Sequence, residues 1–198
     1  RQHVKSLPIG RTPATVNAID FHPLGTLMVT GCSDGMVRVY DLGAGMLVQR
    51  WHAHDGHVRA VKFTKPNGGV SSVLSAGTDG RMVEWSLAAS AAAVSRQYIM
   101  SAMPAHPRAY ERSMVYNKER DHIAAGSAHG AAVLYRIARQ TPVQYIDGHD
   151  QSVLSIAWET APGCPLSTIA TGSTDQTVKL WALRRVRDGS GVFASGGS

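Results

Sequence analysis

Residues 79–85 read DGRMVEW, an acidic turn followed six positions later by a large aromatic side chain. The same spacing occurs at residues 34–40 (DGMVRVY) and 175–181 (DQTVKLW). A degenerate copy at residues 129–135 (HGAAVLY) has His129 in place of the acid. The four turns, at positions 34, 79, 129 and 175, lie 45, 50 and 46 residues apart. The chain is therefore built from four copies of one repeated unit.

The sequence around each turn alternates between apolar and polar residues. The first copy contains three such stretches, at residues 16–21 (VNAIDF), 27–30 and 37–40. A turn at residues 22–25 separates the first two stretches, and a turn at residues 33–35 separates the last two. Alternation with a period of two between turn residues predicts β-strands. Units of about 40 to 45 residues that contain several short strands are typical of β-propeller blades. The sequence therefore predicts an all-β fold.

These copies resemble the WD40-repeat family, whose repeats open with Gly-His, close with Trp-Asp and carry a Ser or Thr and an Asp between. Gly148-His149 opens the fourth copy and Ala53-His54 opens the second. Each of these histidines stands four residues before a valine and nine before an aromatic residue, an offset that rejects Gly56-His57 as the opening pair. The closing pairs depart from the family pattern, and they are Tyr40-Asp41, Trp85-Ser86, Tyr135-Arg136 and Trp181-Ala182.

The resemblance covers residues 12–183 and implies an all-β, WD40-type β-propeller with about four blades of four-stranded antiparallel sheet. Propellers of this family usually have about seven blades, so we expect a partial propeller that belongs to a larger one. Residues 1–11 would form the outer strand of a preceding blade, and residues 184–198 a basic, Gly/Ser-rich tail. The repeats would span residues 12–52, 53–102, 103–147 (degenerate) and 148–183. The open sheet edges would need cover from further blades, a partner chain or a second copy.

The resemblance also implies a buried polar network inside each well-matched blade. In such a network a carboxylate accepts from one imidazole nitrogen, a hydroxyl meets the other nitrogen, and an indole N–H donates to that hydroxyl. Its members would be His54, Ser75, Asp79 and Trp85 in the second copy, and His149, Thr171, Asp175 and Trp181 in the fourth. Loss of one member would leave buried partners unmatched.

The first and third copies match this network less well. The first keeps Thr30, Asp34 and Tyr40 but has Thr12 at the position of the histidine. The third has His129 in place of the acid and an alanine in place of the hydroxyl. We therefore expect the third network to be absent or rebuilt.

Composition excludes several classes of protein. Two cysteines, Cys32 and Cys164, provide neither a disulfide framework nor a structural zinc site. No apolar run approaches the roughly 20 residues of a membrane span, and no signal peptide or N-glycosylation acceptor is visible. These features predict an intracellular protein, cytoplasmic or nuclear, without membrane insertion.

No catalytic or cofactor-binding motif occurs in the sequence. There is no Walker-type loop, no Gly-x-Gly-x-x-Gly and no zinc-protease helix. Residues 126–130 (GSAHG) do not satisfy the Gly-x-Ser-x-Gly pattern of a nucleophile elbow. His52, His54 and His57 are close enough in sequence to suggest a metal site, but His54 is claimed by the network and we interpret the other two as solvated. The sequence predicts no enzyme activity, no cofactor and no metal.

The family resemblance points to one propeller face as the binding surface. In such propellers the loops that lead into each blade lie with the Asp-bearing turns around the channel, and that face commonly receives peptides or partner domains. The candidate contact residues on this face are Asp55, His57 and Arg59 in the second repeat, and Asp150, Gln151 and Ser152 in the fourth. Arg184, just beyond the last repeat, is a further candidate for partner binding.

The leading functional prediction is a non-catalytic scaffold that binds other proteins within a larger intracellular complex. A first alternative is a substrate receptor of a ubiquitin ligase. Some family members dock an adaptor through an Arg two residues beyond the closing Trp-Asp, and residues 181–184 (WALR) match this partly. A second alternative is association with RNA or ribonucleoprotein, suggested by the net charge of +6 and the basic cluster at 184–187. Protein partners rank above nucleic acid because the other basic residues are scattered and the aromatic residues mostly occupy repeat positions.

Overall fold

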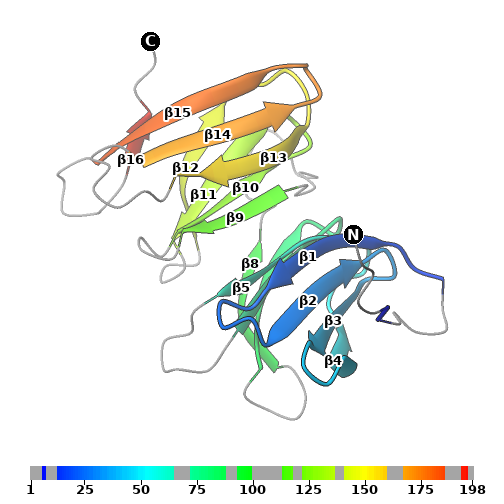
Figure 1. The fold of residues 1–198 in the computed structure, drawn as a ribbon. Helices are drawn as coiled ribbons and strands as arrows, with labels where there is room; N and C mark the ends of the chain where they lie inside the picture. Colours follow the sequence, from blue (N-terminus) through cyan, green and yellow to red (C-terminus); the bar gives the residue numbers. More distant parts are fainter. Residues whose placement is uncertain are drawn as a thin grey trace, which may run out of the picture. The chain divides into compact units, whose positions relative to one another are not determined.

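The computed structural model describes residues 6–7, 13–64, 72–87, 93–99, 113–117, 122–136, 141–159, 167–185 and 193–195. Within these ranges the chain forms β-strands and turns, without a helix. The strands make four four-stranded sheets, and in each sheet consecutive strands are antiparallel neighbours (Figure 1). The predicted all-β fold is confirmed.

The chain divides into two compact units, Arg1–Ile99 and Met100–Ser198, and each unit contains two sheets. The strands of the first unit are β1 (Val16–Phe21), β2 (Leu27–Cys32), β3 (Met36–Asp41), β4 (Met46–His52), β5 (Val58–Thr64), β6 (Ser72–Gly77), β7 (Arg81–Ser86) and β8 (Ala93–Ile99). Strands β1 to β4 form one sheet and β5 to β8 the other. The strands predicted at residues 16–21, 27–30 and 37–40 are confirmed as β1, β2 and β3.

The second unit repeats this arrangement. Its strands are β9 (Ser113–Asn117), β10 (His122–Gly126), β11 (Ala131–Arg136), β12 (Thr141–Asp147), β13 (Val153–Trp158), β14 (Ser167–Ser173), β15 (Val178–Arg185) and β16 (Phe193–Ser195). The short strand β16 pairs with the end of β15 through residues 183–185. The end of β15 and the whole of β16 lie in residues 184–198, which the sequence analysis assigned to a tail. The sequence did not reveal this pairing, because pairing at a sheet edge uses backbone groups and leaves no side-chain pattern. The predicted repeat boundaries themselves stay predictions, and residues 1–5 and 8–11 lie outside the described part.

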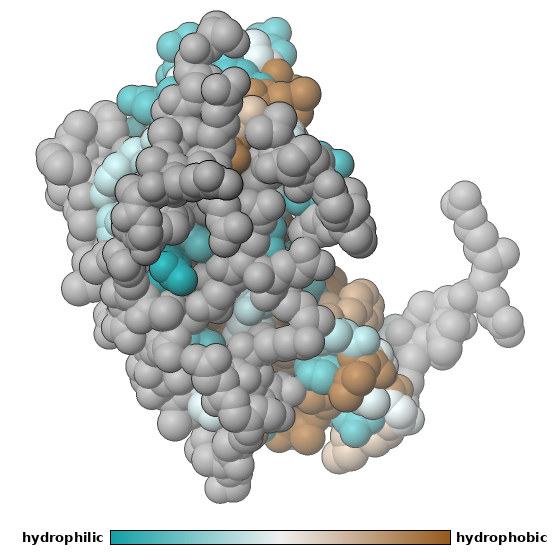
Figure 2. All heavy atoms as spheres, turned by 90° about the vertical axis from the view of Figure 1, so that its left-hand side faces the viewer, coloured by the Kyte–Doolittle hydropathy of each residue, from teal (hydrophilic) through white to brown (hydrophobic). Residues whose placement is uncertain are grey.

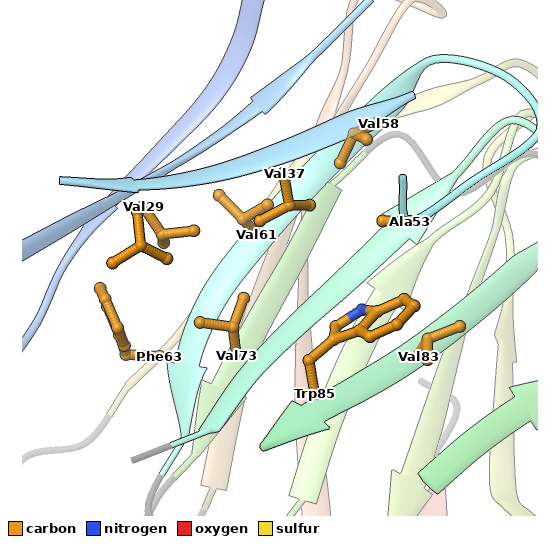
Figure 3. Packing of buried hydrophobic residues seen from close by; sticks show 10 residues of the cluster. Val29, Val37, Ala53, Val58, Val61, Phe63, Val73, Val83 and Trp85 are labelled. Atoms are coloured by element: carbon orange, nitrogen blue, oxygen red, sulfur yellow. The ribbon is translucent and has the colours of Figure 1, made fainter. Parts of the chain in front are cut away.

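An apolar core lies between the two sheets of the first unit. Val29, Val37 and Val39 from β2 and β3 pack against residues of the neighbouring sheet that include Val61 and Phe63. Figure 3 shows Val29 and Val37 close to Val61, with Phe63, Val73 and Trp85 on the facing side. Branched aliphatic residues at alternate strand positions place their side chains on the same face of a sheet. The face of one blade is thus covered by the face of the next.

The second unit has a matching core. Its buried members are Ala124, Ala132, Leu134, Ile146, Trp158, Ile169 and Leu183. Ala132 and Leu134 lie on β11, and Trp158 ends β13 of the other sheet. Both units therefore use the same contact, in which the first and second strands of one sheet lie closest to the first strand of the next, and apolar side chains of the third strand join the shared core.

A glycine in the turn between β2 and β3, Gly35, allows the backbone that leads into the next sheet to approach closely. Gly35 has φ of 75°, and its carbonyl accepts hydrogen bonds from the backbone N–H of Ala53 (2.9 Å) and of His54 (3.2 Å). A Cβ at Gly35 would overlap the carbonyl oxygen of His54. Gly130 repeats this in the second unit: its φ is 86°, its carbonyl accepts from the N–H of His149 (3.2 Å), and a Cβ there would overlap the carbonyl oxygen of that histidine. Only glycine suits both the backbone angle and the close approach.

Candidate protein-binding surface

The structure brings together the four predicted network residues of the second copy. Nδ1 of His54 lies 2.9 Å from Oδ1 of Asp79, and Nε2 lies 2.8 Å from the hydroxyl of Ser75. Trp85 donates its indole N–H to the same hydroxyl at 2.8 Å. His54 and Ser75 are fully buried. Because the hydroxyl accepts from Trp85 and the carboxylate accepts from Nδ1–H, a neutral imidazole whose Nε2 accepts from Ser75 satisfies every member.

The fourth copy forms the same network. Nδ1 of His149 lies 2.7 Å from Oδ2 of Asp175, and Nε2 lies 2.7 Å from the hydroxyl of Thr171. Trp181 donates its indole N–H to that hydroxyl at 2.8 Å. Thr177 adds a hydrogen bond of 2.6 Å from its hydroxyl to Asp175. The network thus ties the connection before β13 to the turn before β15.

In the first copy the turn acid, Asp34, pairs with an arginine and not with the histidine that the WD40 pattern would supply. The guanidinium of Arg38 binds Asp34 through both of its terminal nitrogens, at 2.6 Å and 3.1 Å. Thr30 and Tyr40 are buried on the same sheet. Sequence reasoning missed Arg38. A charged residue in the middle of an apolar strand could have revealed it, because the first copy lacks the network histidine and its acid needs another partner. The hydrogen bond from Arg38 lowers the pKa of Asp34 below its ordinary range.

The third copy lacks the network because Ala125 cannot supply a hydroxyl. His129 is exposed at the turn, and its backbone N–H donates to the hydroxyl of Ser127 at 3.2 Å. Tyr135 is buried in the sheet. This blade therefore holds its turn with Ser127 instead of an acid.

Hydrogen bonds to the turn before β7 hold the backbone of the candidate contact residues Asp55 and His57 in place. The N–H of Asp55 donates to Asp79 at 3.2 Å, and the N–H of His57 donates to the hydroxyl of Thr78 at 3.0 Å. The side chains of Asp55 and His57 are exposed, and Arg59 is half-buried at the start of β5.

Sequence reasoning also missed Arg81, the second residue after the turn acid of this copy. Its guanidinium lies 3.0 Å from the carboxylate of Asp55 and 2.8 Å from that of Asp79. The arginine therefore links the exposed loop to the buried network. The sequence could have indicated this role, because a basic residue stands just beyond the Asp-Gly turn.

The equivalent loop before β13 is held in the same way. The N–H of Asp150 donates to Asp175 at 3.3 Å, and the backbone carbonyl of Gln151 accepts from the hydroxyl of Ser173 at 3.1 Å. Asp150 and Gln151 are exposed. Ser152 is half-buried and donates its hydroxyl to the carbonyl of Ala128 at 2.9 Å, so it supports the loop more than it faces outward.

Arg184 is placed only by its backbone. It lies on β15 opposite Ala194 of β16, and its side chain lies outside the described residues, as do residues 186 and 187. Among the described residues, no group of three His, Cys, Asp or Glu side chains is positioned to hold a metal ion. In the same part of the chain, no helix is long and apolar enough to span a membrane.

The network shifts the pKa values of its members. Burial raises the pKa of Asp79. The charge that His54 carries once acid protonates it, the hydrogen bond from His54 and the hydrogen bonds from Arg81 together outweigh burial, so the pKa of Asp79 lies below the ordinary value. Burial lowers the pKa of His54, against the opposing effect of Asp79. At Asp175, the hydrogen bond from Thr177 lowers the pKa, with burial opposing and His149 assisting. These directions keep the imidazole of His54 neutral and the carboxylates ionised near neutral pH.

We expect the free energy of unfolding to fall as the pH is lowered from neutrality. His54 binds a proton more readily in the unfolded chain, so its contribution is lost below the ordinary histidine pKa of about 6.5. The contributions of Asp79 and Asp175 are lost below the ordinary aspartate pKa of about 3.9. Urea denaturation at a series of pH values should show both stages, and Asp79→Asn should weaken the second. A stability that rises on acidification from pH 7 to 4 would contradict these assignments.

Comparisons with known proteins agree with the repeated geometry. The sequence profile described as "WD domain, G-beta repeat" matches residues 2–41 and 140–182. A protein named "WD repeat-containing protein 91 homolog" from Dictyostelium discoideum is 27% identical over 172 residues, covering 87% of this chain and 22% of that protein. "WD repeat-containing protein 91" from Rattus norvegicus is 28% identical over 189 residues, covering 86% of this chain and 24% of that protein. The chain thus spans about a quarter of the length of these curated relatives.

Solved structures show the same fold. The crystal structure of the computationally designed Ika4 protein superposes with a TM-score of 0.68 at 20% identity, covering 91% of this chain and 99% of that chain. The designed Ika8 protein gives a TM-score of 0.65 at 21% identity, covering 85% of this chain and 46% of that chain. Together with the repeat matches at residues 2–41 and 140–182 and the His-Ser/Thr-Asp-Trp geometry of two sheets, this shows that the chain contains WD40-type repeats and that its four sheets are blades of the β-propeller type.

Proposed function

We propose that this chain is a non-catalytic scaffold that binds other proteins through the exposed loops leading into its blades. The observation that carries the proposal is that hydrogen bonds to the buried network fix the backbone of these exposed loops. Asp55 and Asp150 are exposed, and each has its backbone N–H bonded to a turn acid of the buried network. A surface that is ordered before binding loses little conformational freedom when a partner arrives.

The family supports the same proposal. WD40 domains generally bind other proteins, and WD40-repeat proteins are generally non-catalytic. We further propose that the protein works in an intracellular complex, cytoplasmic or nuclear, because its two cysteines fit a reducing compartment. The partner would meet a surface of mixed charge, since Arg81 stands beside the carboxylate of Asp55.

The two alternative functions depend on the end of β15. A ubiquitin-ligase receptor would use Arg184, and an RNA-binding protein would use residues 184–187. No observation on the described residues favours either alternative over a general protein scaffold.

Charge reversal at the loops should weaken partner binding. We expect Asp150→Lys and Asp55→Lys each to reduce the affinity for a protein partner at least about fivefold, because loss of one anchoring contact costs about 1 kcal/mol or more. Partners would be identified by affinity purification with quantitative mass spectrometry, and their binding would then be titrated. Glu159→Lys is the matched control, since Glu159 is also exposed but lies at the other end of β13 from Asp150.

Thermal melts would verify that each variant folds. Unchanged recovery of every partner by both loop variants and by their combination would contradict the proposal. A partner that binds more tightly as salt is lowered and is displaced by RNA would favour the nucleic-acid alternative instead.

A further inference from the structure

Two loops of the chain share one backbone arrangement. The loop before β5 and the loop before β13 each follow a network histidine, and each carries an exposed aspartate next to it, Asp55 or Asp150 (Figure 1). The backbone N–H of each aspartate donates to the turn acid of its blade, at 3.2 Å to Asp79 and at 3.3 Å to Asp175. Each loop connects the two sheets of its own unit, so the two loops can be compared residue by residue.

In the second repeat, an arginine of the chain itself binds the loop carboxylate. Nη2 of Arg81 lies 3.0 Å from the carboxylate of Asp55 and 2.8 Å from that of Asp79, and Nε donates to Asp79 at 2.9 Å. The guanidinium therefore bridges the loop carboxylate and the turn acid. The side chain of Arg81 is 35% exposed, so this bridge lies at the surface of the unit.

In the fourth repeat, a threonine takes the position of this arginine. The backbone N–H of Arg81 and that of Thr177 each donate to Oδ1 of the turn acid two residues earlier, at 3.1 Å and 2.9 Å. The hydroxyl of Thr177 donates to Asp175 at 2.6 Å, so the turn acid keeps a side-chain partner at this position. The loop carboxylate, Asp150, receives none from Thr177, because the hydroxyl is used on the turn acid.

No other cation replaces the missing arginine. Among the residues that the structure describes, no Arg or Lys side chain forms an ion pair with Asp150 or Asp175. Lys179 instead directs its ammonium group to the backbone carbonyl of Gly148. The fourth repeat therefore presents the same two carboxylates as the second repeat, without the guanidinium that bridges them there.

The two carboxylates of the fourth repeat suit a guanidinium. The side chain of Asp175 is 8% exposed and that of Asp79 is 10% exposed, so the two turn acids are equally shielded from water beneath their loops. A planar guanidinium has several N–H donors and can bond more than one carboxylate oxygen at once. The surface in Figure 2 mixes hydrophilic and hydrophobic residues, so individual charged groups have to provide selectivity between partners.

We propose that Asp150 binds an arginine side chain of a protein partner, which takes the position in the fourth repeat that Arg81 takes in the second. This inference rests on the proposed function, because it names the chemical group by which a partner holds the loop before β13. Arg81 already occupies the carboxylate of Asp55, so the loop before β5 attracts an added cation less. The residue two positions after the turn acid thus decides which loop selects arginine.

An NMR titration with model peptides tests the preference for arginine. The probes are two blocked glycine peptides that differ only in a central arginine or a central citrulline, which has nearly the same shape without the charge. We expect the arginine peptide to bind at least about threefold more tightly than the citrulline peptide, the size of a surface ion pair. The backbone amide signals of Asp150 and Gln151 report both affinities, and added salt should reduce the difference.

Reciprocal substitutions assign the preference to these residues. Asp150→Asn should abolish it, because the change removes the charge and keeps the size. Thr177→Arg should abolish it as well, because it installs the residue that fills this position in the second repeat. Arg81→Thr should create a preference for the arginine peptide at the amide signal of Asp55. Each exchange introduces a residue that the other repeat already accommodates.

Glu159→Gln is the matched control, since it removes an exposed carboxylate at the other end of β13 and should leave the preference unchanged. The amide spectra would confirm that each variant folds. Equal binding of both peptides to the wild-type chain would overturn the proposal. A preference that survives Asp150→Asn or Thr177→Arg would overturn it too. If Arg81→Thr gains no preference, Arg81 does not set the difference between the loops.

Failure of this proposal can be told apart from failure of the scaffold. Suppose that purified protein partners lose affinity with Asp150→Lys but bind the Asp150→Asn variant as they bind the wild type. The loop would then contact partners, and the scaffold proposal would stand, but arginine would not be the group that Asp150 recognises.

Discussion

Replacing His54 by alanine should lower the free energy of unfolding by about 2 to 4 kcal/mol. The substitution removes a fully buried side chain and leaves a cavity, and it strips Asp79 and Ser75 of a hydrogen-bond partner in the same step. The indole N–H of Trp85 would then donate to a hydroxyl that has lost its other partner. Urea denaturation followed by tryptophan fluorescence measures the change.

A neighbouring histidine provides the control for this prediction. His52 is exposed at the end of β4, so His52→Ala should change the free energy of unfolding by no more than about 0.5 kcal/mol. His149→Ala should resemble His54→Ala, because it breaks the same set of contacts in the second unit. A His54→Ala protein as stable as the wild type would mean that the network does not stabilise its blade.

Replacing Gly35 by alanine should destabilise the chain by about 2 to 5 kcal/mol. An alanine at φ of 75° is strained by about 1 to 2 kcal/mol, and its Cβ would overlap the carbonyl oxygen of His54, which is backbone and cannot rotate away. Overpacking of this kind costs about 1 to 3 kcal/mol more. The displaced connection would also loosen the network that begins at His54.

Gly25 separates the two causes. It has φ of 70°, close to that of Gly35, but an added Cβ there meets nothing within 4 Å. Gly25→Ala should therefore show the backbone strain alone, at about 1 to 2 kcal/mol. Equal losses of stability in the two variants would show that the approach of the neighbouring sheet to Gly35 contributes nothing.

Local spacing in the sequence was enough to predict the strands and the polar networks of the second and fourth copies, because both depend on contacts at fixed offsets. Asp79 and Trp85 are six residues apart across one turn and strand, and Ser75 lies just before that turn. Strand alternation then places the hydroxyl and the indole on the same face, where the imidazole of His54 reaches them.

The side-chain partners of Asp34 and Asp55 could not be read from that spacing. Asp34, in the turn before β3, pairs with Arg38 of that strand, and Asp55 pairs with Arg81 from another segment. An arginine side chain is long and flexible and can reach several neighbours. Its hydrogen-bond partner therefore depends on which carboxylates the folded sheets bring within reach. The pattern of the family would have assigned a histidine to Asp34.

The sequence by itself determined that this chain is a set of β-propeller blades, because period, turn chemistry and alternation act within one repeat of the chain. Only the tertiary structure decided which apolar faces are covered. Val37 and Val178 occupy the same position in their repeats, yet one is buried and the other exposed. The physical reason is that burial depends on whether another sheet packs over that face, and a repeat does not encode the presence of its neighbour.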